Sequence, residues 1–278
     1  MGASSHPAMD PLGLVFDDAP RPGAAHMERD AGSFAAAEHG DDACVPVLRW
    51  FTWDRPTVSL GRHESVARFD EAALAAAEIP LCVRPTGGRA VFHVDEWTYV
   101  ALVPLDHPTL GGSLATSTRA LTQLVATALE RAYGLRCDGP GDAGAGDRLP
   151  AGPPTCFARS FGYELTVGGR KLMGSAQRRG RRALLQQGSL LVGPGHEHIA
   201  RFLRDTAGDP GTAAGEAALR HATTNLAALL GRRPDPRPFR EALAGAWHAA
   251  LQGTSKTGGA SGSGQASAAP LDRPGRPS

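Results

Sequence analysis

Short runs rich in β-branched and aromatic residues, each bounded by turn residues, dominate the chain between residues 45 and 103. Neighbouring runs follow one another at intervals of about 8–12 residues, which is typical of short strands joined by turns. This pattern predicts a mixed or antiparallel sheet. The runs lie at 45–50, 57–60, 81–84, 89–93 and 98–103.

Later in the chain, strand-like and helix-like segments continue without strict alternation. Three further strands are expected at 163–167, 170–177 and 182–192, the first two joined by the tight turn Gly168-Gly169. Apolar residues spaced three and four apart predict helices, one of them opened by the candidate N-cap Ser113. This order of elements predicts an α+β fold, with mixed or antiparallel β-sheets flanked by helices. The expected helices lie at 69–78, 113–133, 199–203, 215–230 and 238–251.

The length of 278 residues suits one large domain, which we place at 12–252. Residues 1–11 and the tail 253–278 have too few apolar residues to offset the entropy lost on ordering, so both are expected to be disordered. A Gly- and Pro-rich stretch at 139–154 is expected to be a flexible loop.

Lysine is scarce in this sequence. Of 29 basic residues only Lys171 and Lys256 are lysines, and Lys256 lies in the Gly- and Ser-rich tail. Lys171 is therefore the only lysine of the expected folded part. The formal net charge of +1 indicates neither a nucleic-acid partner nor an anionic membrane surface.

The four cysteines show no metal-binding spacing and no disulfide pattern, so we expect no metal and free thiols in a reducing compartment. The N-terminus lacks the basic start and apolar run of a signal peptide, and no apolar stretch reaches the length of a membrane span. These observations predict a soluble cytoplasmic protein that does not act at a membrane.

A glycine pair lies between two of the expected strands, in the segment that runs from Arg84 through Thr86, Gly87, Gly88 and Arg89 to His93. Glycines let a backbone approach a ligand closely, and adjacent N–H groups can bind an anion beside the two arginines. The alternative is an ordinary hairpin turn followed by a structural histidine.

Lys171 lies on an expected strand bounded by the small residues Gly174, Ser175 and Ala176. If it points into a pocket, its ammonium can hold an acyl carbonyl while negative charge develops on the oxygen. The alternative is a solvated strand lysine. Cys156 follows the Gly- and Pro-rich stretch, and Arg159 and Lys171 could lower its pKa enough for reaction. A free cysteine is otherwise a small buried hydrophobe.

Taken together and in this order, these segments resemble the catalytic domain of the lipoate-protein ligase and octanoyltransferase superfamily, which also contains the biotin-attachment enzymes. The resemblance covers about residues 12–204. It rests on the segments 49–61, 84–93, 169–177 and 187–191. Within the superfamily the chain is most similar to the octanoyl-carrier-protein:protein N-octanoyltransferases of Gram-positive bacteria, in which a cysteine precedes the lysine by the same interval as Cys156 precedes Lys171.

The resemblance implies that Cys156 accepts the acyl group as a thioester and that Lys171 holds the acyl carbonyl. Arg84 to Arg89, His93 and Gly174 to Ala176 would bind the substrate. The donor would be an octanoyl-acyl-carrier protein, the acceptor a lysine of a lipoyl domain or of the glycine-cleavage H protein, and no cofactor would be needed.

Two alternatives stay open. An ATP-dependent lipoate-protein ligase would need ATP and Mg²⁺ and would leave Cys156 idle, but such ligases generally show Asn-Asp where Tyr163-Glu164 stands here and commonly carry an accessory domain. A non-catalytic acyl- or carrier-binding protein on the same fold is the third reading. It is suggested by Val83 and Val94, which replace the first of two arginines and the acidic residue usual in the family.

Overall fold

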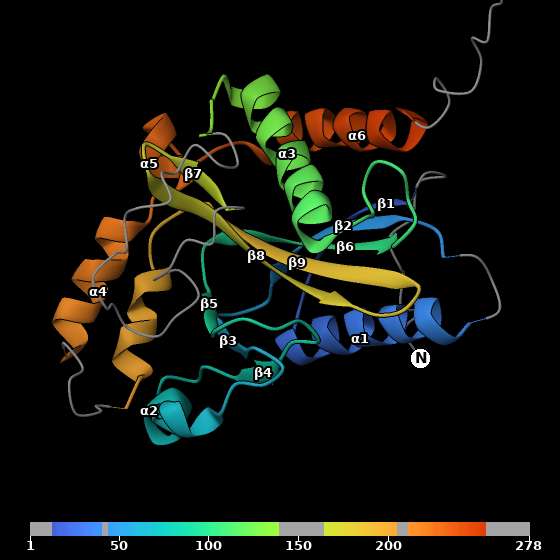
Figure 1. The fold of residues 1–278 in the computed structure, drawn as a ribbon. Coiled ribbons are helices and arrows are strands. Elements are labelled where there is room, and N and C mark those ends of the chain that lie inside the picture. Colours follow the sequence, from blue (N-terminus) through green and yellow to red (C-terminus); the bar gives the residue numbers. More distant parts are fainter. Residues whose placement is uncertain (1–12, 41–43, 139–163, 205–210, 254–278) are drawn as a thin grey trace, which may run out of the picture.

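A computed structural model of the chain describes residues 13–40, 44–138, 164–204 and 211–253 (Figure 1). The expected disordered start, the expected loop 139–154, the candidate nucleophile Cys156 and all of the tail after Gly253 lie outside the described residues.

The larger of two sheets has six strands in the order β1-β2-β6-β9-β8-β7. β1 and β2 are parallel, and every other neighbouring pair in this sheet is antiparallel. Because β6 and β9 come from distant parts of the sequence and lie at the centre, the sheet joins the two halves of the chain. The strands are β1 (Leu14–Arg21), β2 (Val47–Trp53), β6 (Glu96–Pro104), β7 (Leu165–Val167), β8 (Arg170–Arg179) and β9 (Ala183–Leu191).

The smaller sheet has three short strands in the order β4-β3-β5, namely β3 (Thr57–Leu60), β4 (Leu81–Val83) and β5 (Val91–His93). The segments η1 (Val66–Arg68) and α2 (Glu71–Ala76) connect β3 to β4. The side chain of Asp70 accepts hydrogen bonds from the first backbone N–H groups of α2, which is the usual reason for a helix to begin after an aspartate.

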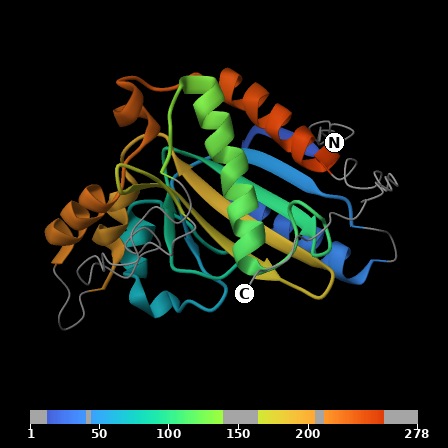
Figure 2. The same cartoon turned by 45° about the horizontal axis from the view of Figure 1, so that its top comes forward.

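Helices cover the larger sheet on one face, and α1 (Gly23–His39) lies with the smaller sheet on the other (Figures 1 and 2). The covering helices are α3 (Leu114–Tyr133) and α6 (Pro236–Gln252), which pack against each other. Ser113 caps the N-terminus of α3 as expected, and Gly134 ends that helix in the left-handed conformation. The main apolar core lies under these two helices, with the buried Trp50, Tyr99 and Trp247 as its largest side chains.

The end of the larger sheet at β7 and β8 is closed by η3 (His196–Phe202), α4 (Gly211–Ala222) and α5 (Leu226–Leu230). A single helix expected at 215–230 is wrong, because residues 223–225 interrupt it. There Thr223 forms a bridge with Lys171, and the backbone N–H of Thr224 donates to the Lys171 carbonyl. A backbone that hydrogen-bonds to a neighbouring strand cannot continue a helical pattern.

The α+β prediction is confirmed, and each of the eight expected strands lies on an observed one. The sequence reading did not find β1 or α1. In α1 two polar side chains, His26 and Asp30, are buried beside apolar ones, so the apolar periodicity that predicts a helix is interrupted.

Candidate functional site

A pocket lies between the two sheets, with walls from β2, β3, β5, β6, β8 and β9 and one side chain from α1. About 420 Å³ of space lies between its atoms, part of it open to solvent. One wall is made mainly of small residues on paired strands, since Gly174 lies opposite Ser189 and Ser175 opposite Gly188. The lining residues are Met27, Trp53, Ser59, Arg84, Val91, His93, Thr98, Gly174, Ser175, Ala176, Gln187, Gly188 and Ser189.

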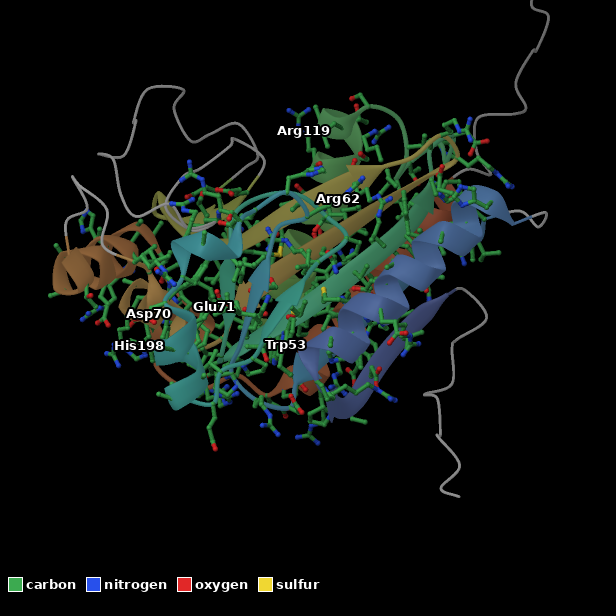
Figure 3. All side chains as sticks on the ribbon, turned by 90° about the horizontal axis from the view of Figure 1, so that it is seen from below. Trp53, Arg62, Asp70, Glu71, Arg119 and His198 are labelled. Carbon is green, nitrogen blue, oxygen red and sulfur yellow. The ribbon has the colours of Figure 1, made fainter. Side chains whose placement is uncertain are left out.

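Trp53 and His93 form a flat wall of this pocket. Their rings stack at 3.9 Å between centroids with an interplanar angle of 15°. In the view from below, Trp53 lies close to α1 and the smaller sheet (Figure 3). The indole Nε1 of Trp53 donates to the hydroxyl of Thr98 at 2.7 Å, so the ring is held from both its face and its edge.

A β-bulge decides where Lys171 points. Leu165 on β7 pairs with Met173 on β8, whereas the next residue, Thr166, pairs with Lys171, so Leu172 is an extra residue in β8. Leu172 and Met173 are both buried in the apolar core. In an unbroken strand Lys171 would share the face of Met173, but the extra residue turns its side chain away from the core.

Lys171 is almost completely buried and pairs with the carboxylate of Glu164, which is nearly as buried. Since burying an isolated charge is expensive, this partner is what allows the ammonium to stay in place. The alternative of a solvated strand lysine is therefore excluded. Close by, His196 hydrogen-bonds to the hydroxyl of Thr223 at 2.9 Å, directly beside the Lys171 backbone.

His196 connects the Lys171 region with the pocket electrostatically. Burial lowers its pKa to about 4, the charges of Glu197 and Glu96 oppose that shift, and the charge of Lys171 adds to it. The His196 imidazole therefore lies within electrostatic range of both Lys171 and Glu96. Lys171 precedes the lining residue Gly174 by three positions on β8.

The buried side chain of Arg84 holds the glycine turn in place through hydrogen bonds. Its Nε and Nη2 donate to the carbonyl of Gly87 at 3.1 and 2.7 Å, and Nη2 also donates to the carbonyl of Arg89 at 2.7 Å. Gly88 has φ +86, and a Cβ on the facing Gly61 would stand 1.9 Å from the Gly88 carbonyl oxygen. The turn therefore needs glycine on both sides, and Arg84 fixes its shape while its side chain lines the pocket.

A buried network of polar side chains lies at one end of the pocket, centred on the carboxylate of Glu96. Nδ1 of His93 lies 2.7 Å from Oε1 of Glu96, and Nε2 lies 2.7 Å from the hydroxyl of Ser59. The hydroxyl of Thr98 donates to Glu96 Oε1 at 2.5 Å, and that of Ser189 donates to Oε2. Burial raises the pKa of Glu96, but the charge and hydrogen bond of His93 and the two hydroxyls outweigh it, so the pKa lies below the usual value.

A second network lies at the other end and joins the glycine turn to α1. The hydroxyl of Thr86 donates to Gln187 at 2.7 Å, and the amide of Gln187 donates to Asp30 at 2.7 Å. Asp30 also accepts from Arg49 at 2.5 Å. Burial raises the pKa of Asp30, and the charge of Arg49 offsets this only in part.

The structure brings most of the predicted site residues together. Arg84, His93, Gly174, Ser175 and Ala176 line one pocket, although the Ser175 hydroxyl bonds to Tyr99 on the other side of the sheet. Thr86 lies behind the wall, bonded to Gln187, while Gly87, Gly88 and Arg89 form the turn. Of the two positions that depart from the family pattern, Val83 is 58% exposed, so no second arginine reaches into the pocket from there.

Sequence reasoning missed the side chains that hold the pocket wall in place. Six of the nine occur on strands, where polar side chains alternating with apolar ones were the available signal. The missed residues are Met27, Asp30, Trp53, Ser59, Glu96, Thr98, Gln187, Ser189 and His196. Within the described residues no group of three or more His, Cys, Asp or Glu side chains could hold a metal ion.

The model of the lipoyl protein ligase A/B catalytic domain matches residues 27–248 of this chain. The chain belongs to this family. It is 34% identical over 244 residues to the octanoyltransferase LipM of Symbiobacterium thermophilum, with 85% of each chain covered.

Two solved structures of the family show the same fold. One is described as a bi-partite lipoate protein ligase and its E2 lipoyl domain from Thermoplasma acidophilum, with a TM-score of 0.66, 18% identity and 86% of this chain and 83% of that one covered. The other is a lipoate-protein ligase A bound with ATP, with a TM-score of 0.63, 20% identity and coverage of 86% and 85%. No helix among the described residues is long and apolar enough to cross a membrane.

Proposed function

We propose that this protein transfers an octanoyl group from an octanoyl-acyl-carrier protein to a lysine of a lipoyl domain or of the glycine-cleavage H protein, by way of a thioester on Cys156. The observation that carries the proposal is the combination of the pocket between the two sheets with the buried Lys171, which precedes the lining residue Gly174 by three positions on β8. The family membership and the likeness to the octanoyltransferase LipM of Symbiobacterium thermophilum support the same reaction.

In the proposed reaction the octanoyl chain occupies the pocket with its carbonyl toward Lys171, whose ammonium donates to the carbonyl oxygen. The Cys156 thiolate attacks this carbon, the bond to the carrier sulfur breaks, and the carrier leaves as a thiolate that takes a proton from water. The neutral amine of the acceptor lysine then attacks the thioester. The Cys156 thiolate leaves, and the amine loses its proton as the amide forms.

The three described cysteines are poor candidates for the nucleophile. Burial raises the pKa of Cys44, that of Cys82 to about 11, and that of Cys137 to about 12. A thiol reacts as its thiolate, so these groups are held in the unreactive form at neutral pH. This leaves Cys156 as the proposed acyl acceptor, and we place the enzyme in the cytoplasm, where its thiols stay reduced.

The carboxylate of Glu164 favours the transferase over an ATP-dependent ligase. By the family resemblance, ATP-dependent ligases generally carry Asn-Asp where this chain has Tyr163-Glu164. Here Glu164 already engages the Lys171 ammonium. A reaction that starts from a thioester needs no nucleotide, so we expect transfer without ATP or Mg²⁺ and without any other cofactor.

Intact-mass spectrometry tests the proposal directly. The protein is incubated with octanoyl-acyl-carrier protein, and an octanoyl adduct that hydroxylamine removes is expected. Cys156→Ala should lose both the adduct and transfer to a lipoyl domain, while the matched control Cys137→Ala should keep both. Undiminished transfer by Cys156→Ala would overturn the thioester mechanism. Product formed only with ATP and Mg²⁺ would instead show a ligase. If no product forms with or without ATP and Mg²⁺, the protein would be a non-catalytic acyl-binding protein.

A further inference from the structure

Four of the polar side chains that line the pocket meet in one place, at Glu96. His93, Thr98 and Ser189 bond directly to its carboxylate, and Trp53 is joined to it through Thr98. Glu96 itself is not among the lining residues, so its charge lies behind the wall. The four side chains come from β5, β6, β9 and β2.

The direction of these hydrogen bonds follows from the chemistry of the acceptor. An ionised carboxylate can only accept, so Thr98, Ser189 and Nδ1 of His93 must turn their protons toward Glu96. Having given its proton away, the Thr98 oxygen presents lone pairs and accepts from Trp53 Nε1. The polar hydrogens of Thr98, Ser189, His93 Nδ1 and Trp53 therefore point at protein atoms rather than into the pocket.

Ser59 completes the same side of the pocket. Its hydroxyl lies between Nε2 of His93 at 2.7 Å and Nη1 of Arg84, which donates to it at 3.2 Å. With Nδ1 of His93 protonated, Nε2 of the neutral ring accepts from Ser59. If the ring is charged, Nε2 donates to Ser59 instead. In either state the hydrogen between them stays within the protein.

The same principle holds at the opposite end of the pocket. The hydroxyl of Thr86 donates to Gln187, and the amide of Gln187 donates to the Asp30 carboxylate and approaches the sulfur of Met27 at 3.4 Å. Each chain of donors therefore ends on a buried carboxylate, Glu96 at one end and Asp30 at the other. The hydroxyl and amide hydrogens of the wall are thus donated to other protein atoms.

We propose that Glu96 is a positioning residue that makes this polar-lined pocket selective for an unsubstituted alkyl chain, because it directs the hydrogens of Thr98, Ser189 and His93 away from the bound substrate. A hydrocarbon cannot accept a hydrogen bond, so any donor left pointing at it would be buried without a partner. The inference deepens the proposed function, on which it rests for the identity of the acyl chain.

Register places this wall beside the middle of the chain. Ser189 and Thr98 lie opposite each other on β9 and β6, and Ser189 also faces Gly174 on β8. Gly174 follows Lys171 by three residues, one of which is the extra residue Leu172, so the two lie about 7 Å apart along the strand. A substrate whose carbonyl is held at Lys171 therefore passes Ser189 and Thr98 with its methylene groups.

The test compares octanoyl with an analogue in which an ether oxygen replaces one methylene near the middle of the chain. The ether oxygen accepts hydrogen bonds, so the wild-type wall should reject it in favour of octanoyl. In Glu96→Gln the amide nitrogen donates to Ser189, whose own hydrogen must turn toward the pocket. We expect the octanoyl KM to rise more than kcat falls, and the octanoyl-to-ether ratio of kcat/KM to fall by about tenfold.

A second variant keeps the buried charge and the shape of the site. Thr98→Val removes the acceptor of the Trp53 indole hydrogen, which leaves this donor without a partner at the pocket wall. The octanoyl-to-ether ratio of kcat/KM should therefore fall, as it does in Glu96→Gln. The matched control is Glu216→Gln, which removes a carboxylate that pairs with Arg201 and Arg220 away from the pocket. Its ratio should equal that of the wild type.

Calorimetric binding of octanoate and of the ether acid separates this inference from the proposed function, since binding needs no transfer chemistry. If wild-type protein transfers no octanoyl group but still prefers octanoate over the ether acid, and Glu96→Gln loses that preference, the inference stands and the proposed function fails. If folded Glu96→Gln and Thr98→Val both keep the wild-type ratio, Glu96 does not set the selectivity and the inference is overturned.

Discussion

Replacing Lys171 by methionine tests the idea that the buried carboxylate of Glu164 stabilises its charge. The side chains of Lys171 and Glu164 are 3% and 6% exposed. Methionine keeps most of the apolar stem but leaves the Glu164 carboxylate without the ammonium. Removing one partner of a buried ion pair costs about 3–5 kcal/mol. For a domain of this size each kcal/mol lowers the melting temperature by about 2–4 °C, so a fall of about 6–20 °C is expected.

The double variant Lys171→Met/Glu164→Leu separates the effect of the charge from the effect of packing. It removes both charges together, and apolar replacement of a buried pair is often neutral or stabilising. We expect it to recover most of the stability and none of the transfer activity, because the ammonium is still missing. As a control, Arg136→Met breaks the exposed pair with Glu130, in which the side chains are 88% and 55% exposed. It should change stability by less than about 1 kcal/mol.

Urea denaturation gives the free energy of unfolding of the four proteins, and transfer to a lipoyl domain gives their activity. A loss below about 1 kcal/mol in Lys171→Met would refute the reasoning, since removing one partner of a buried ion pair costs about 3–5 kcal/mol. A double variant as unstable as the single one would refute it as well, because the instability would then come from packing rather than from the charge.

Three further results are expected. Lys171→Arg keeps the charge and the fold but should lose most transfer activity, because a planar guanidinium is wider than an ammonium; unaltered transfer by the folded variant would remove Lys171 from the active site. In Gly188→Ala the new Cβ would stand 2.1 Å from Cε1 of Tyr99, so urea denaturation should show a loss of about 1–3 kcal/mol, while the control Gly32→Ala, with nothing within 4 Å, should show none. Burial, aided by the Arg49 charge, lowers the pKa of His26 to about 4, below its unfolded value of about 6.5. As the pH falls through this interval only the unfolded state takes up the proton, so stability present above pH 6.5 should fall by about 2 kcal/mol between pH 7 and 5, and an equally steep fall in His26→Gln would contradict this.

Much of the architecture could be predicted because local chemistry decided it. The Gly168-Gly169 turn has φ values of 58 and 73, which the sequence anticipated from two adjacent glycines between strand-like runs. Ser113 likewise marks the start of α3 as expected from its side-chain cap, and Gly134 ends the helix in the left-handed conformation. Such signals act within a few residues, so one sequence is enough to find them.

Helix α1 shows where local reasoning fails. His26 and Asp30 occupy positions that face the larger sheet, where Arg49 and Gln187 satisfy them. A helix whose buried face contains charged groups has no apolar stripe in its sequence. Its existence depends on partners that lie at least 19 positions away along the chain.

The sequence by itself determined which residues are proposed to carry the chemistry, since the rarity of lysine and the glycine turn pointed to Lys171 and to Arg84 without any structure. Only the tertiary structure decided the direction of the Lys171 side chain and the role of Glu96. Strand alternation would have placed Lys171 on the core face beside Met173, but the extra residue Leu172 turns it away. The role proposed for Glu96 depends on hydrogen bonds from His93, Thr98 and Ser189, which lie on three different strands. Pairing across strands and a bulge in their register are set by contacts between distant segments, and the order of residues along one chain does not record them.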